Sequence, residues 1–135
     1  GMSNLAYEGF KTFIRYEGNQ RVGNCAACHA LPDFADGKSH NVQPGMKQAP
    51  TTSLRNLNKS SQALQKIIDQ KIHYAKIKQK GGATEISDTY SKIRLHQDDV
   101  SALVAFIEIL QGVPEQKFRQ LILDSVVFNP SVDPD

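Results

Sequence analysis

Two cysteines and a histidine stand together in the segment Cys25-Ala26-Ala27-Cys28-His29. Thiols three positions apart on a helical turn can each add to one vinyl group of a haem and form a thioether bond. The adjoining imidazole can then bind the iron from the proximal side. The C-x-x-C-H spacing therefore predicts one covalently bound haem c, with Cys25 and Cys28 as attachment points and His29 as proximal iron ligand.

Three other kinds of site use cysteines at this spacing. A redox-active C-x-x-C is expected beside a β-α-β pattern, which the sequence lacks. A structural zinc site takes four Cys or His ligands in two paired clusters, and the chain has no second cysteine pair. A disulfide between positions 25 and 28 would cross-link very little chain. Haem attachment is favoured over all three.

The sixth iron ligand decides whether such a haem only carries electrons or also binds small molecules. Met46 is the only methionine apart from Met2, and its thioether could reach the iron from a long loop and raise the reduction potential. His40 and His96 are weaker candidates, because His40 is expected to hydrogen-bond within its loop and His96 to lie beside a helix N-cap. An open sixth position is a further alternative.

The composition is that of an ordinary globular domain. The chain has 135 residues, of which 39 % are hydrophobic and 22 % charged, and this argues against disorder. A net charge of only +2 and the absence of Trp argue against a nucleic-acid partner. The longest apolar stretch, residues 100–110, is too short to span a membrane.

Apolar residues at helical spacing predict helices over residues 3–17, 61–80, 97–111 and 114–127. No segment alternates as a strand does, so the predicted fold class is all-α. Residues 19–59 show no sustained period, and a loop this long is expected to be organised by the haem. Residues 1–112 are predicted to form a small cytochrome c-like domain, and residues 113–135 a C-terminal helix and extended tail.

Four further blocks carry a resemblance. They are Phe34-Ala35-Asp36-Gly37 with His40-Asn41, residues 49–56 (APTTSLRN), residues 64–68 (LQKII) and residues 98–107 (DDVSALVAFI). They resemble, in order, F-x-D-x…H-N, T-P-S-L-R-N, L-E-E-V-V and E-x-x-D-L-V-A-F-L of the di-haem cytochrome c peroxidase and MauG family. The match covers residues 5–112 and follows the order of that family's C-terminal haem domain.

The resemblance adds candidates for the haem site. In that family a distal methionine or tyrosine falls seven residues after the leucine of L-E-E-V-V, and the same count from Leu64 reaches Lys71. The turn from Lys71 to Tyr74 thus joins the candidates for the distal ligand, with Tyr74 better placed than His73 by helical phase. Arg55 resembles an arginine that the family places near a haem propionate, where a guanidinium would pair with a carboxylate. Its alternative role is to brace the loop.

The sequence departs from that family in two ways. It lacks the P-Y-x-H-D-G segment after Asn56, and it has no second C-x-x-C-H. The predicted function is therefore electron transfer through one haem c, with a redox partner protein or a second haem module as partner, and the chain is expected not to be an enzyme by itself. The alternatives are the haem domain of a peroxidase or oxidase system and a haem-based ligand sensor.

Haem attachment of this type also predicts an extracytoplasmic protein, either periplasmic or secreted. The first residues show no leader, and a Gly ahead of Met2 is typical of a cleaved tag. We therefore expect that a signal peptide has been removed.

Overall fold

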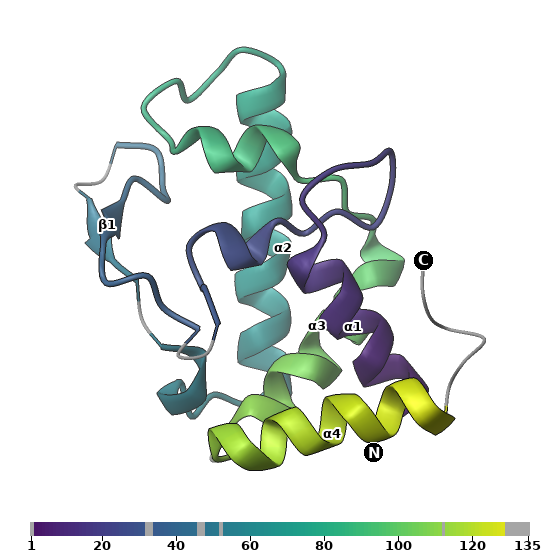
Figure 1. The fold of residues 1–135 in the computed structure, drawn as a ribbon. Helices are drawn as coiled ribbons and strands as arrows, with labels where there is room; N and C mark the ends of the chain where they lie inside the picture. Colours follow the sequence, from purple (N-terminus) through teal and green to yellow (C-terminus); the bar gives the residue numbers. More distant parts are fainter. Residues whose placement is uncertain (1, 32–33, 46–47, 52, 112, 129–135) are drawn as a thin grey trace.

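The computed structural model describes residues 2–31, 34–45, 48–51, 53–111 and 113–128 (Figure 1). These residues form four α-helices, α1 (Asn4–Ile14), α2 (Ser61–Gln79), α3 (Gln97–Leu110) and α4 (Glu115–Phe128). They also form the short 3-10 helices η1 (Cys25–Ala27), η2 (Leu54–Asn56) and η3 (Asp88–Lys92). The predicted all-α class is confirmed.

The helix limits follow local capping. Ser60 caps α2, because its hydroxyl accepts a hydrogen bond from the Ala63 N–H at 3.2 Å. The first helix ends at Ile14, earlier than the predicted residue 17, because Arg15 is already extended. The Arg15 carbonyl accepts a hydrogen bond from the Asn24 N–H at 2.9 Å, not from a residue of a continuing helix. This bond turns the chain out of α1 and toward the C-x-x-C-H motif.

The prediction that the chain has no strands is wrong in detail. Strands β1 (Ser39–His40) and β2 (Ala49–Pro50) pair antiparallel, with Ser39 opposite Pro50 and His40 opposite Ala49. Strands of two residues leave no alternating pattern for sequence analysis to detect. Residues 19–59 were expected to be irregular, and the β1–β2 pair gives part of this segment a regular structure.

Helices α1 and α3 pack against each other more closely than side chains would ordinarily allow, and Figure 1 shows them side by side. The contact lies at Gly9, because a Cβ there would fall 1.9 Å from the Ala102 carbonyl oxygen. Helix α2 packs against both α3 and η3. The three helices thus form a frame around the C-x-x-C-H segment.

A cluster of phenylalanine rings joins this frame to the last helix. Ring centroids lie between 5.3 and 6.2 Å apart in a set formed by Phe10, Phe13, Phe34, Phe106 and Phe118. Phe118 brings α4 into the same core, and the Phe118 side chain is only 4 % exposed there.

The division at residue 112 stays a prediction, and the expected extended tail at 129–135 lies outside the described residues. None of the described helices is long and apolar enough to cross a bilayer.

Candidate haem site

The C-x-x-C-H motif is wound into a helical turn, as its chemistry requires. The N–H groups of Cys28 and His29 both donate to the Cys25 carbonyl, at 3.3 and 2.9 Å. Asn24 starts the turn in the left-handed region, which asparagine tolerates, and its side-chain amide donates to the Thr89 carbonyl at 2.9 Å. The motif is thereby anchored to α1 through Arg15 and to η3 through Thr89.

All three functional side chains of the motif line one cavity. Its other walls come from α1, α2, α3, η2, η3 and the loops, and they are mainly apolar. The lining residues are Phe13, Gly23, Asn24, Cys25, Cys28, His29, Val42, Leu54, Leu57, Leu64, Ile67, Ile68, Lys71, Thr89, Tyr90, Ile93, Leu95, Leu103 and Ile107. Such a cavity suits a large apolar ring that needs two thiols and one imidazole.

The imidazole of His29 is held by a hydrogen bond to the backbone. Its Nδ1 lies 2.8 Å from the Phe34 carbonyl oxygen. A carbonyl can only accept, so Nδ1 carries the proton and Nε2 has the lone pair that binds a metal. Phe34 has φ 57°, a strained value for a bulky residue, and its side chain is fully buried. Packing of the Phe34 ring therefore fixes the carbonyl that orients His29.

The two thiols lack the character of a reactive dithiol. Both cysteines are free. Burial raises the pKa of Cys25 to about 12, and burial also raises the pKa of Cys28. Redox-active C-x-x-C pairs have lowered pKa values, because the thiolate is the nucleophile. The structure thus argues against the redox reading of the motif.

The backbone beside Cys25 is closely packed at Gly23. A Cβ at Gly23 would lie 3.1 Å from the Cys25 sulfur and 2.9 Å from the Thr12 carbonyl oxygen. Only glycine keeps both the backbone contact with α1 and the room around this sulfur. The apolar walls, the two neutral thiols and the oriented imidazole together fit a covalently attached haem.

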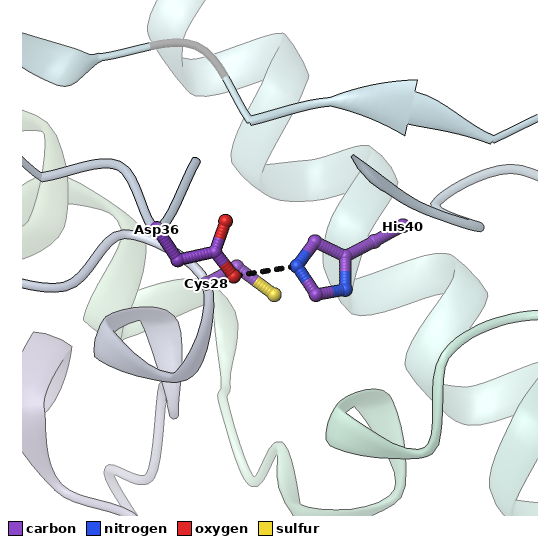
Figure 2. A group of neighbouring side chains, drawn as sticks. All are labelled: Cys28, Asp36 and His40. Atoms are coloured by element: carbon purple, nitrogen blue, oxygen red, sulfur yellow. Dashed lines mark hydrogen bonds and ion pairs between the residues drawn. The ribbon is translucent and has the colours of Figure 1, made fainter. Parts of the chain in front are cut away.

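Beside the motif lies a cluster that the sequence analysis missed. Figure 2 shows Asp36 and His40 next to Cys28, and their ligand atoms all lie within 4.8 Å of one another. His40 Nε2 is 2.6 Å from Asp36 Oδ2, which confirms that His40 hydrogen-bonds within its loop. Asp36 and His40 belong to one of the four blocks described above, but no sequence spacing joins them to Cys28, because only the fold brings that residue beside them. Although the three atoms are possible zinc ligands, a thioether bond at Cys28 would take that sulfur from the set.

The Asp36 carboxylate gives a test of this cluster. The Lys38 N–H, which donates to it at 2.9 Å, lowers the pKa of Asp36 to about 2, and His40 adds to the effect. A carboxyl whose pKa is lower in the folded state stabilises the fold above its unfolded pKa, about 3.9, and loses that contribution as the pH falls toward 2.

We expect Asp36→Asn to be less stable than the parent protein at about pH 6, with the difference shrinking as the pH falls below about 4. Urea midpoints measured across that range check this. Glu17→Gln, which changes an exposed carboxyl, is the control. A difference that is constant with pH would contradict the role assigned to the Asp36 carboxylate.

The candidates for the distal ligand on α2 differ in whether they line the cavity. Lys71 lines the cavity. Tyr74 does not line it, although Tyr74 is half-buried and His73 exposed, as helical phase predicts for this pair. Ligation by Tyr74 stays a prediction. The Tyr74 hydroxyl accepts a hydrogen bond from Gln70 at 3.1 Å, and Tyr74 packs against a small cluster that includes Tyr90. The reason is that η3 packs on the last turns of α2, where the Gln79 amide donates to the Tyr90 carbonyl.

Two of the remaining candidates are histidines that lie away from the cavity. Met46 lies outside the described residues. His73 is exposed. His96 was expected beside a helix N-cap and is itself the N-cap residue of α3, where its backbone N–H donates to the Asp99 carboxylate at 2.9 Å. Neither His73 nor His96 lines the cavity.

Arg55 lies in the aromatic core and does not line the cavity. Its guanidinium carbon is 5.3 Å from the ring centroid of Phe34 and 5.6 Å from that of Phe118, and it donates to the Val113 carbonyl. These contacts match the bracing role, and a contact with a haem propionate stays a prediction.

Tyr90 is a lining residue that the sequence analysis missed. It is 5 % exposed, and its hydroxyl donates to the Val42 carbonyl at 3.4 Å. The segment around Tyr90 forms a 3-10 helix of five residues. An element this short carries no periodic signal that would have marked Tyr90 as a lining residue.

Comparison with known proteins agrees with this geometry. The sequence model of the cytochrome c family matches residues 16–111, which include the motif, α2 and α3. Neither the comparison with curated proteins nor the comparison with solved structures found a match. The family match covers most of the chain and contains every wall of the cavity except Phe13. The chain therefore belongs to the cytochrome c family, whose domains bind haem c covalently and transfer electrons.

Proposed function

We propose that this chain carries electrons through a single haem c, attached at Cys25 and Cys28 and bound by His29. The observation that carries the proposal is that all three side chains of its one C-x-x-C-H line the same apolar cavity. A haem supplies one-electron redox chemistry when it is bound, and the protein supplies orientation, electrostatics and exclusion of water.

The residues around the motif suit this task. The Phe34 carbonyl holds the Nδ1 proton of His29, and such a hydrogen bond raises the basicity of the ligating nitrogen. Leu64, Ile68 and Leu103 on α2 and α3 keep water from the cavity walls. A site built on packed helices moves little, and a carrier needs little rearrangement when its charge changes.

The enzymatic alternative rests on the resemblance to the C-terminal haem domain of di-haem cytochrome c peroxidases. Peroxide cleavage needs a positioned acid–base group beside the iron. Among the described residues that line the cavity, none is a carboxylate, and His29 is the only histidine. This supports the carrier over a peroxidase. The carrier would exchange electrons with a partner protein or a second haem module, in an extracytoplasmic compartment after removal of a signal peptide.

The proposed function predicts how the haem-loaded protein behaves in two assays. Small redox mediators should reduce and reoxidise it completely and reversibly, with one haem per chain by mass. Steady-state assays with hydrogen peroxide should give negligible turnover under conditions in which a known peroxidase is active. Sustained turnover on the order of 1–10³ s⁻¹ would overturn the carrier and favour the enzyme.

A further inference from the structure

One lysine lines the cavity that holds the motif, and its amine lies 5.8 Å from the ring centroid of Tyr90, another lining residue. Lys71 is the only Lys or Arg among the described lining residues. It follows Leu64, Ile67 and Ile68 along the cavity face of α2. Lys66 and Lys76, on the same helix, are exposed. Lys71 therefore differs from the other lysines named here, which give α2 a basic exposed surface.

The surroundings of Lys71 hold no acidic partner. Across the described part of the chain, no carboxylate lies within ion-pair distance of its amine. Its neighbours are the thiols of Cys25 and Cys28 and the ring of Tyr90, whose centroid is 5.8 Å from Nζ. Burial lowers the pKa of Lys71, which favours the neutral amine with its lone pair. Both thiols would be consumed by haem attachment, which would leave the amine facing the haem.

We propose that the Lys71 amine is the sixth ligand of the haem iron. The inference rests on the proposed function, because it needs the haem attached beside it. On binding, the ammonium releases one proton to solvent and Nζ donates its lone pair to the iron, and no electron is transferred. The other polar lining residues on the described walls, besides His29, already have partners. The Asn24 amide donates to the Thr89 carbonyl, the Thr89 hydroxyl bonds with that of Ser87, and the Tyr90 hydroxyl donates to the Val42 carbonyl.

The experiment compares the haem-loaded parent protein with Lys71→Ala, Lys71→Arg and Lys71→Met. Arginine keeps the charge but cannot lose its proton, so it separates ligation from electrostatics. Methionine offers a thioether instead of an amine. Lys66→Ala is the matched control for the loss of an exposed lysine on the same helix, and Met46→Ala tests the other candidate. Far-ultraviolet circular dichroism checks that each variant is folded.

We expect the ferric parent protein to be low-spin, with no far-red sulfur–iron band. Lys71→Ala and Lys71→Arg should become high-spin and bind added imidazole at least about tenfold more tightly, because the internal ligand no longer competes. Lys71→Met should gain the far-red band and a higher reduction potential. Lys66→Ala should match the parent in every spectrum.

Unchanged spectra in Lys71→Ala and Lys71→Arg would overturn the inference. If Met46→Ala alone removed a far-red band, Met46 would be the ligand. A high-spin parent protein would show an open position and equally overturn the inference. The proposed function fails on a different measurement, namely if denatured protein carries no haem by mass.

Discussion

Gly9→Ala is expected to destabilise the protein by about 3 kcal/mol or more, although the same change favours an isolated helix by about 1 kcal/mol. A Cβ at this position would lie 1.9 Å from the Ala102 carbonyl oxygen and 2.9 Å from the Phe106 Cβ. The nearest atom belongs to the backbone of α3, so no rotamer change relieves the clash. The two helices must separate, and the aromatic core between them must loosen.

Urea unfolding of the haem-loaded protein measures this effect. Leu5→Ala is the control on the same helix, because Leu5 is 50 % exposed and its truncation should cost little. If Gly9→Ala proves as stable as the parent protein, the close approach of α1 and α3 is not a feature of the folded chain.

Replacing both cysteines, in Cys25→Ser/Cys28→Ser, is expected to abolish covalent haem attachment. Serine keeps the shape of each side chain but cannot supply the thiolate or thiol that adds to a vinyl group. Each single variant should keep one thioether bond, because the two sulfurs add to different vinyl groups. Protein made with a haem-maturation system and then denatured should show, by mass, one haem in the parent and in each single variant and none in the double variant.

Ala27→Ser is the matched control, since it changes an exposed residue between the two cysteines and leaves both thiols in place. It should retain one haem. The pyridine haemochrome spectrum of each single variant should also differ from that of the parent, because one vinyl group of the haem remains unsaturated. A double variant that keeps its colour through acid–acetone extraction would show that the attachment lies elsewhere.

The long helices could be predicted from the sequence because each has a persistent apolar face and clear end signals. Thus α2 begins at Ser61 and α3 begins at Gln97, as the pattern indicates. The end of α1 could not be predicted, because it depends on a hydrogen bond between Arg15 and Asn24. Sequence spacing says which residues share a helix face, but it does not say which loop will come to lie beside them.

The same limit applies to the site. Cys25, Cys28 and His29 could be predicted to share a site because attachment chemistry dictates their spacing, and the three residues line one cavity. The carbonyl that orients His29 belongs to Phe34, and any residue type has a carbonyl. Helical phase favoured Tyr74 over His73, and Tyr74 is the more buried of the two. Helical phase could not show that η3 packs against α2 and places Tyr90 at the cavity. That contact is tertiary, so no local pattern records it.

The position of Phe34 links two distant parts of the chain. Its carbonyl accepts from His29, while its ring packs edge-on against Phe118 of α4 at 5.4 Å between centroids. Arg55 lies against both rings. Transient undocking of α4 would therefore remove the support that keeps the Phe34 backbone strained. If His29 binds the iron as proposed, we expect the lifetime of that bond to depend on the local opening rate of α4, which begins 86 positions later, at Glu115.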